Sequence, residues 1–340
     1  MKTEVFKNID ESGLQRCGKL LREGQPVAFP TETVYGLGAN ALNDNAVAKI
    51  FAVKNRPQDN PLIAHVSDER MVPMAAREVS PLAQSLFAAF WPGPLTVILP
   101  KAEGLSSKVT AGGDTVAVRC PAHPVARALI EAAGVPIVAP SANLSGRPSP
   151  TDFDTTFEDL AGKVPAIIDG GRCDVGVEST VVLPTGAHRV RILRPGAITP
   201  AMLEGLGLTV DIDPNVLAPL DDSKPVLSPG MKHRHYAPKA PLTIVTGDTP
   251  AVLAFLKAKQ SQGAGILCFE GELEGEFVRT YGKANDPNAQ SKALFAALRQ
   301  FDKLPVTAIY ARKPCTQGVG LAVYNRLLRA AEFQILEVEK

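Results

Sequence analysis

The chain has 340 residues, 45% hydrophobic and 21% charged, which is ordinary for a globular protein and leaves room for two domains. Its net charge is +1: residues 1–200 contain 20 basic and 20 acidic residues, and residues 201–340 contain 16 basic and 15 acidic residues. Neither part shows the basic excess typical of proteins that bind nucleic acids mainly through phosphate contacts. Long apolar runs and a signal-peptide pattern are missing and the five cysteines are widely spaced, so a cytoplasmic protein with reduced thiols and no membrane association is expected.

The first quarter of the chain predicts alternating helices and strands. Its apolar pattern favours a helix over 8–24, a strand over 27–29, a helix over 43–53 and a strand over 62–66. Gly36 and Gly38 predict a tight turn that lets the backbone approach a ligand closely. Loops at strand ends are where open α/β sheets bind ligands, so this region is the first candidate site.

Lys54 and Arg56 are two residues apart on a segment that Pro57 and Pro61 keep extended. One offers a point charge and the other a planar fork, and together they suit a phosphate or a carboxylate. The alternative is that two cations merely end a helix favourably through its dipole. Spacing alone favours neither interpretation.

Three segments of this region carry a more specific signal: Pro30-Thr-Glu-Thr-Val-Tyr-Gly-Leu-Gly38, Lys54-Asn-Arg56 and Asn60-Pro-Leu-Ile-Ala-His65. Together they resemble the YrdC family, which makes threonylcarbamoyl-adenylate from L-threonine, bicarbonate and ATP, with release of pyrophosphate. The product serves the N6-threonylcarbamoyl modification of adenosine 37 in tRNAs that read ANN codons. The resemblance therefore implies a nucleotidyltransferase, an L-threonylcarbamoyladenylate synthase.

The middle of the chain predicts helices over 80–90 and 123–133 and strands over 95–99, 115–121 and 135–139. A loop of small residues follows the last of these strands and presents Ser141, Asn143 and Ser145 beside backbone N–H groups. Its Ser-x-Asn wording resembles the ATP site of the YrdC family. Two alternatives are an ordinary polar turn and a nucleophilic serine, but Ser145 lacks the Gly-x-Ser-x-Gly pattern of a nucleophile elbow.

Two later segments carry hydroxyl and guanidinium groups. A strand and turn over 167–171 precede Val177-Glu-Ser-Thr-Val-Val182, which places Ser179 and Thr180 at the start of a strand. Arg194 stands beside a Pro-Gly turn and is a candidate phosphate partner. The alternative is that it belongs to a solvated strand edge.

Residues 206–240 are rich in proline and aspartate and have little periodicity, which predicts a linker. Within it, 228–238 contains His233, His235 and Tyr236 and resembles the linker of the two-domain form of the YrdC family, which covers the active site. We therefore expect a lid over the site, with Tyr236 at the nucleotide. Two histidines on a loop without a third ligand are a weak metal signal, so the metal ligands are left open.

The linker separates a first domain over 1–205 from a second over 241–340. In the second, strands alternate with helices, which predicts a small parallel sheet: strands over 242–246, 265–269 and 306–311, helices over 250–259, 289–301 and 321–331. The resemblance implies a YrdC-like α/β domain with a twisted open mixed sheet, then a smaller Rossmann-like α/β domain. The second domain shows no catalytic constellation, so its expected role is to support the site and anchor the lid.

The resemblance also assigns site residues. Threonine would contact Thr33, His65, Arg119 and Ser179. ATP would contact Lys54, Arg56, Asn60, Thr115, Ser141, Asn143, Arg194 and Tyr236, with Lys54 and Arg56 as the catalytic candidates for charge stabilisation. Mg²⁺ is implied with ATP, and because the motifs offer few carboxylates (Glu32, Glu178), phosphates and water are expected to hold it.

Two other functions agree less well with the sequence. An RNA-binding module conflicts with the balanced charge and the absence of an aromatic RNA-recognition motif. A carbamoyltransferase acting on another acceptor would resemble hydrogenase-maturation proteins, which also carry cysteine pairs and an acylphosphatase segment that this sequence lacks. The expected partners are threonine, bicarbonate, ATP and downstream threonylcarbamoyl-transferase machinery, without stable nucleic-acid binding.

Overall fold

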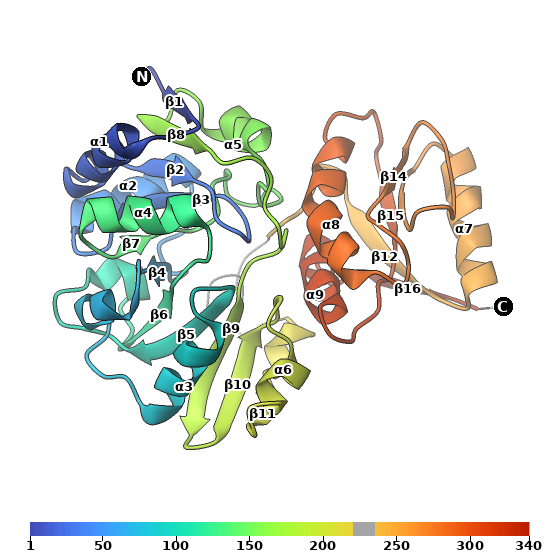
Figure 1. Ribbon diagram of the computed structural model, residues 1–340. Helices are drawn as coiled ribbons and strands as arrows, with labels where there is room; N and C mark the ends of the chain where they lie inside the picture. The colour runs from blue at the N-terminus through green and yellow to red at the C-terminus, as the bar shows by residue number, and fades with distance from the viewer. Residues whose placement is uncertain (220–234, 340) are drawn as a thin grey trace.

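The structure is a computed structural model that describes residues 1–219 and 235–339. These residues form a large α/β domain followed by a smaller one (Figure 1). The expected lid residues 228–234, including His233, lie outside the described part of the chain. Within that part, no helix is both long and apolar enough to cross a membrane.

The large domain is built on an 11-stranded sheet, among the described residues, with both parallel and antiparallel neighbours. The expected mixed sheet is thus confirmed. In spatial order its strands are β1 (Glu4–Lys7), β8 (Ala166–Asp169), β2 (Val27–Phe29), β3 (Gly36–Asn40), β7 (Ile137–Val138), β4 (Ile63–His65), β6 (Thr115–Arg119), β5 (Leu95–Pro100), β9 (Thr180–Gly186), β10 (Arg189–Arg194) and β11 (Thr209–Ile212).

Helices cover both faces of this sheet. The longer ones are α1 (Glu11–Arg22), α2 (Asp44–Lys54), α3 (Pro81–Phe90), α4 (Pro124–Ala133) and α5 (Phe153–Leu160). Shorter turns are α6 (Pro200–Glu204), η1 (Glu69–Met74), η2 (Ser107–Thr110) and η3 (Pro214–Val216). In β2, Val27 and Phe29 pack in a cluster with α1 and α4, whereas Ala28 packs in the cluster of α2 and α3, as the two-residue repeat of a strand requires.

Local capping explains where two predicted helices begin. The side chain of Ser80 accepts a hydrogen bond from the N–H of Ala83, and that of Asn43 accepts from Asn45 and Ala46. Both residues satisfy N–H groups that a first helical turn leaves without partners.

Two expectations about local structure are corrected. Gly36 and Gly38 do not form a turn but lie in β3, antiparallel to β2. A Cβ at Gly38 would stand 2.8 Å from the ring of Phe29, so glycine is needed there for packing between strands. The large sheet also continues past residue 205, because β11 pairs with β10 inside the region expected to be a linker.

The second domain has the expected parallel sheet, with all of its strand pairs parallel. Its strands, in spatial order, are β14 (Val278–Thr280), β13 (Gly265–Cys268), β15 (Ile309–Arg312), β12 (Leu242–Gly247) and β16 (Ile335–Val338). Figure 1 shows α7 (Thr249–Ser261) on the side away from the large domain, and α8 (Pro287–Phe301) and α9 (Gly320–Ala330) between the two domains.

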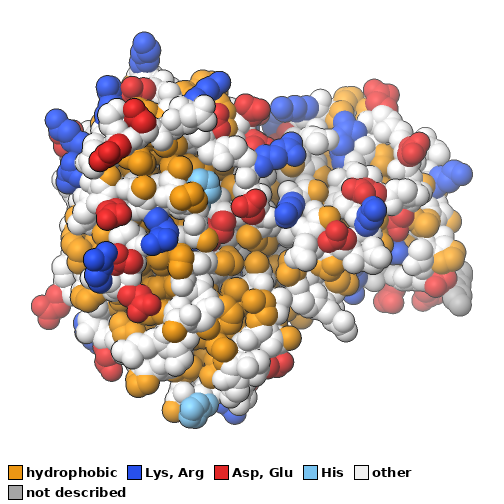
Figure 2. All heavy atoms as spheres, viewed as in Figure 1, with side chains coloured by type: hydrophobic (Ala, Val, Ile, Leu, Met, Phe, Trp, Pro, Cys, Tyr) orange, Lys and Arg blue, Asp and Glu red, His pale blue; other side chains and the backbone are white. Residues whose placement is uncertain are grey.

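The two domains are closely packed through α8. The hydroxyl of Ser291 donates to the carbonyl of Val175 at 2.8 Å. Gly176 has a φ of +81°, and a Cβ there would lie 2.5 Å from the Cα of Lys292, so only glycine fits this contact. Basic and acidic side chains are interspersed over the face seen in Figure 2, so that face has no extended basic surface.

Candidate functional site

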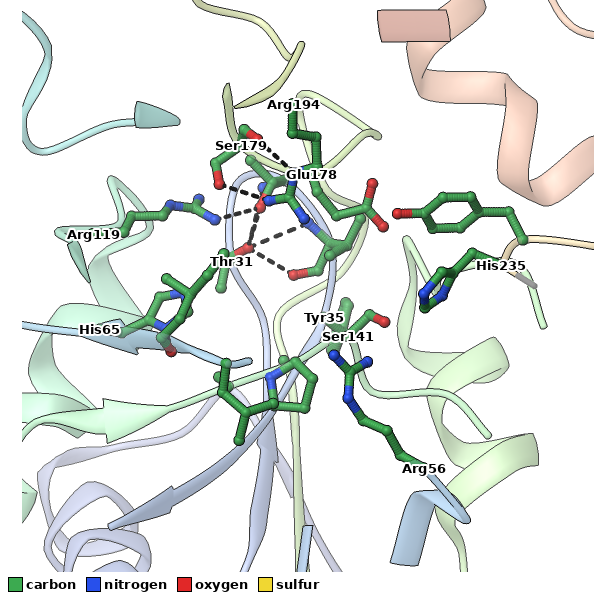
Figure 3. A pocket seen from close by; sticks show the side chains of 18 residues that line it. Thr31, Tyr35, Arg56, His65, Arg119, Ser141, Glu178, Ser179, Arg194 and His235 are labelled. Atoms are coloured by element: carbon green, nitrogen blue, oxygen red, sulfur yellow. Dashed lines mark hydrogen bonds between the residues drawn. The ribbon is translucent and has the colours of Figure 1, made fainter. Parts of the chain in front are cut away.

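A pocket opens in the large domain where several central strands end (Figure 3). It is lined by all the residues predicted for threonine: Thr33, His65, Arg119 and Ser179. It is also lined by four of the residues predicted for ATP: Arg56, Ser141, Arg194 and Tyr236. The structure therefore brings together side chains that are up to 203 positions apart in the sequence, from Thr33 to Tyr236 (236 minus 33).

Strand register explains this convergence. His65 ends β4 and is the register partner of Arg119, which ends the neighbouring parallel strand β6. Arg194 ends β10 opposite Val181 of β9, and Ser179 directly precedes β9. Four polar side chains thus lie together at one end of neighbouring strands in a sheet whose interior is apolar. Strand ends are the usual place for ligand sites in α/β proteins.

Arg119 fixes one wall of the pocket. Its Nη2 lies 2.7 Å from a carboxylate oxygen of Glu32, with both side chains buried, and its Nη1 donates to the hydroxyl of Thr33 at 2.9 Å. Burial raises the pKa of Glu32, but the adjacent guanidinium outweighs this and the pKa is lowered. The charge of Arg119 is thereby balanced while Thr33 is held in one orientation, with the Thr31 hydroxyl 2.9 Å from it.

Ser179 joins this wall to Arg194. Its hydroxyl is 2.7 Å from that of Thr96, and Arg194 donates to both its hydroxyl and its carbonyl oxygen at 3.1 Å. Burial, and next the charge of Arg326, lower the pKa of Arg194 to about 10. The guanidinium therefore stays charged at neutral pH in a place nearly without water.

His65 is neutral at working pH. Its Nδ1 is 3.1 Å from the carbonyl oxygen of Ile63, and because a carbonyl only accepts, Nδ1 carries the proton. Full burial, followed by the nearby charge of Arg119, lowers the pKa of His65 to about 3. The imidazole is thus a polar neutral lining group and not a titrating base between pH 5 and 8.

This burial predicts a measurable acid sensitivity. An unfolded chain protonates His65 below a pKa near 6.5, whereas the folded state resists protonation down to about 3. The unfolded state binds more protons in that window, so stability falls as the pH falls. Between pH 7 and 5, the wild type should lose about 2 kcal/mol more unfolding free energy than His65→Asn. Denaturant unfolding at both pH values measures this; equal losses would contradict it.

Arg56 presents a donor toward the pocket. It follows the end of α2, where Asn55 adopts a left-handed conformation with a φ of +52° and turns the chain. Its Nη2 donates to the carbonyls of Asn60 and Pro61 at 3.4 and 3.3 Å, while its buried Nε has no hydrogen-bond partner among the described residues. Burial lowers the pKa of Arg56 to about 10, so the group is still a cation suited to an anionic ligand.

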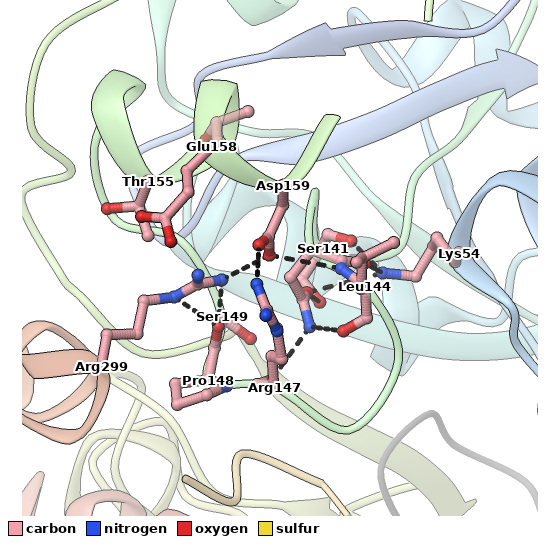
Figure 4. Close-up of polar contacts among 12 residues, drawn as sticks. Lys54, Ser141, Leu144, Arg147, Pro148, Ser149, Thr155, Glu158, Asp159 and Arg299 are labelled. Carbon is pink, nitrogen blue, oxygen red and sulfur yellow. Dashed lines mark hydrogen bonds and ion pairs between the residues drawn. The ribbon is translucent and has the colours of Figure 1, made fainter. Parts of the chain in front are cut away.

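Lys54, in contrast, does not line the pocket. It is 1% exposed, and its ammonium group donates to the backbone carbonyls of Ser141 and Asn143 from the side of the loop 141–148 that faces away from Arg299 (Figure 4). Burial, then the charge of Arg56, lowers the pKa of Lys54 well below its usual value. The structure thus shows Lys54 as a clamp of the loop.

Three other predicted residues lie outside the lining. Asn143 makes contacts within the loop, accepting from Ser141 and donating to the carbonyls of Leu144 and Arg147. Asn60 lies behind the lining, with its amide nitrogen 3.4 Å from Nε2 of His235.

Thr115 starts β6, four residues before Arg119, which corresponds to about 13 Å along a strand. Thr115 therefore lies at the other end of β6 from Arg119 and outside the pocket lining.

Tyr236 closes the pocket on the side of the second domain. Its backbone has a φ of +63°, unusual for a tyrosine, and its ring stacks on Phe295 of α8 with centroids 5.1 Å apart. The next residue, Ala237, donates its N–H to the carbonyl of Gly146 at 2.9 Å. The tyrosine is thus held between the loop 141–148 and α8.

The second domain also contributes a contact to the pocket that the sequence did not predict. Glu178 lines the pocket, and its carboxylate accepts from Ser149 at 2.5 Å and from Nε of Arg326 in α9 at 2.6 Å. Burial raises the pKa of Glu178, but Arg326 and then Arg194 outweigh it and lower the pKa. The sequence offers no local signal for a pair 148 positions apart.

Three further polar lining residues were also missed: Thr31, Tyr35 and His235. Each belongs to or adjoins a motif already singled out, and this nearness was the available signal. The hydroxyl of Tyr35 donates to the carbonyl of Gly171 at 2.8 Å, which points to a role in holding the loops.

Carboxylates for a metal ion are scarce in this pocket. Among the residues that the structure describes, no group of three or more His, Cys, Asp or Glu side chains is placed to hold a metal. Both oxygens of Glu178 have partners, and Glu32 is paired with Arg119. The site therefore does not fit a metal held by protein side chains.

Comparisons with known proteins cover nearly all of the chain. A family model described as "Telomere recombination" (Sua5, YciO, YrdC) matches residues 19–196, and one described as "Threonylcarbamoyl-AMP synthase, C-terminal domain" matches 198–332. The chain is 43% identical over 335 residues to a threonylcarbamoyl-AMP synthase of Bacillus subtilis, covering 97% of this chain and 96% of the relative. It is also 43% identical over 340 residues to one of Pyrococcus abyssi, covering 98% of each.

Solved structures agree with these matches. The crystal structure of Pyrococcus abyssi Sua5 complexed with L-threonine is similar with a TM-score of 0.92 and 41% sequence identity, covering 99% of this chain and all of the other. The similarity extends over both domains and the arrangement between them.

Proposed function

Because the chain belongs to the Sua5/YciO/YrdC family, with the C-terminal domain of threonylcarbamoyl-AMP synthases, we propose that the pocket described above is where its substrates react. The chain is an L-threonylcarbamoyladenylate synthase, with a role in tRNA modification. The observation that carries the placement is a pair of arginines, the half-buried Arg56 and the buried Arg194, in one pocket with the neutral wall of Thr33 and His65. Cations on one side and neutral hydrogen-bonding groups on the other suit a nucleotide beside an amino acid.

The reaction has two balanced steps. The threonine amine combines with bicarbonate to give a carbamate and water. A carbamate oxygen then bonds to the α-phosphorus of ATP while the bond to the bridging oxygen of pyrophosphate breaks. Neither step needs a covalent nucleophile from the protein, so positioning and charge neutralisation supply the catalysis.

The proposal gives each residue a role. Thr33, His65, Arg119 and Ser179 bind threonine. Because Arg119 is already balanced by Glu32, it acts as a rigid donor more than as a net charge. Arg56 and Arg194 neutralise phosphate charge, Ser141 and the N–H groups of its loop bind the nucleotide, and Tyr236 covers it. In this assignment Lys54, Asn60 and Asn143 act from behind the lining, and Thr115 contacts ATP only where the nucleotide extends beyond the pocket.

Magnesium enters as part of the substrate, MgATP. Phosphate oxygens and water would hold it, since Mg²⁺ prefers mostly hydrated coordination and the described residues of this pocket include few carboxylates. We place the enzyme in the cytoplasm, where it passes its product to the transferase that modifies tRNA. The balanced charge and interspersed surface in Figure 2 favour handover of a small molecule over stable RNA binding.

Pyrophosphate release tests this proposal. With MgATP, release should require both bicarbonate and L-threonine and should fall sharply with L-serine. Arg56→Gln should raise the KM for ATP about 10–100-fold, because a charged hydrogen bond contributes about 1.5–3 kcal/mol. Release without threonine, or an unchanged KM for ATP in Arg56→Gln, would overturn the placement. A carbamoyltransferase using another acceptor would show release that depends on that acceptor.

A further inference from the structure

Asp159, at the end of α5, is a buried charge that the mechanism above does not use. Its side chain is 0% exposed and accepts from three donors: the N–H of Leu144 at 3.3 Å, Arg147 at 2.6 Å and Arg299 at 2.8 Å. Leu144 and Arg147 belong to the loop 141–148, whereas Arg299 belongs to α8 of the other domain. One carboxylate thus ties the proposed nucleotide loop to the second domain.

Arg299 also reaches the loop directly. Its Nε and Nη2 donate to the carbonyl of Pro148 at 3.0 and 2.7 Å. A guanidinium that bridges a carboxylate and a carbonyl fixes both in one plane, which a lysine cannot reproduce. The side chain is only 11% exposed, so water does not easily replace these bonds.

The loop is also held from within the first domain, where the N–H groups of Ala142 and Ser145 donate to the carbonyls of Tyr35 and Lys54. Its described residues belong to no helix or strand, and Lys54 holds it from the opposite side through the carbonyls of Ser141 and Asn143 (Figure 4). Lys54 lies in the first domain and can act without the second. The Asp159 side of the loop depends on how the two domains are docked, as does the contact of Gly146 with Ala237, whose neighbour Tyr236 stacks on α8.

The same helix orders the lid residue. Phe295, one helical turn before Arg299, stacks on Tyr236, and Ser291, one turn earlier still, binds the carbonyl of Val175. Residues four apart lie on one face of a helix, so this face of α8 contacts the loop, the tyrosine and the first domain together.

We propose that Arg299 is a positioning residue for the ATP subsite, which it shapes from the second domain by holding Asp159 and the carbonyl of Pro148. This rests on the function proposed above, in which the loop 141–148 binds ATP. It assigns the second domain a part in ATP affinity, beyond its role as a support.

Arg299→Met tests the proposal with little risk to folding, because Asp159 keeps Arg147 as a partner. The variant should raise the KM for ATP about 10-fold, from the loss of one charged hydrogen-bonding group, while the KM for threonine changes less than about twofold. Arg299→Lys should restore part of the affinity. A nonhydrolysable ATP analogue, titrated calorimetrically, should show the same loss in binding.

Lys303→Met is the matched control. Lys303 also bridges the domains, to Glu158, but at 3.7 Å with both side chains more than half exposed. Such a pair contributes little, so this KM for ATP should stay within about twofold of wild type. Equal KM values for both variants, or an Arg299→Met variant in which only the melting temperature falls, would overturn the inference. Failure of the proposed function would differ: the wild type itself would then release no threonine-dependent pyrophosphate.

Discussion

Replacing Arg326 by methionine should lower the apparent free energy of unfolding by about 3–5 kcal/mol, the cost of removing one partner from a buried ion pair. Arg326 is completely buried, and it contacts Glu178 through both its Nε and its Nη2. Among the described residues, the carboxylate of Glu178 then keeps the hydroxyl of Ser149 and the attraction of Arg194. Urea unfolding followed by circular dichroism measures the loss.

The same substitution should reduce activity through Arg194. A carboxylate without Arg326 attracts Arg194 more strongly and competes with the phosphate for it, so the KM for ATP rises together with the loss of stability. Arg326 also lies 5.8 Å from the ring centroid of Tyr236, and its removal loosens the residue that closes the pocket. Pyrophosphate release at saturating threonine separates this effect from simple loss of folded protein when rates are normalised to the folded fraction.

A charge-removing second change provides the control. In Arg326→Met with Glu178→Gln, no carboxylate is left unpaired, and at least about half of the lost stability should return. Glu178→Gln alone leaves Arg326 buried without its counter-charge and should also destabilise the protein. A double variant no more stable than Arg326→Met would show that the ion pair is not what the arginine contributes.

Much of the fold could be predicted because its signals are local. The helices predicted to begin near Asn43 and Ser80 and the alternation of strands and helices in the second domain depend on neighbouring residues, and the structure confirms them. β3 was misread because two glycines usually mark a turn, whereas here Gly38 makes room for Phe29 of the adjacent strand. That requirement is set by a contact between strands and is invisible in the local sequence.

The residues of the site also divide into those with a local signal in the sequence and those without one. Residues inside recognisable motifs, such as His65 and Arg119, were placed in the pocket before any geometry was known, and the structure puts them there. The sequence indicates Glu178 only as a carboxylate that could face a metal, and it gives no signal for Arg326. Their pairing depends on how two domains dock, and the energy of a buried ion pair is set by that packing and by exclusion of water, not by spacing in the chain.

The action predicted for Lys54 differs from the contacts that the structure shows. The sequence predicts a cation on the phosphates, whereas in the structure the ammonium group donates to the carbonyls of Ser141 and Asn143. Lys54→Met keeps the aliphatic stem but leaves these carbonyls without a donor, so it should lower the unfolding free energy by about 2–4 kcal/mol even without ATP. It should also raise the KM for ATP, because the loop loses the side chain that binds its carbonyl groups.

Lys49→Met is the matched control for Lys54→Met, since it lies on the same helix and its ammonium group donates to a single carbonyl, that of Gly24, at 2.8 Å. It is partly exposed, so its loss should lower the unfolding free energy by about 1 kcal/mol or less and leave the KM for ATP unchanged. Unfolding without ATP decides between the two actions of Lys54. If Lys54 acts only by binding the phosphates, Lys54→Met should leave the stability of the ATP-free protein unchanged or increase it, because burying a cation costs free energy. A clamp makes stability and ATP affinity fall together, since the carbonyls that lose their donor belong to the loop that binds the nucleotide.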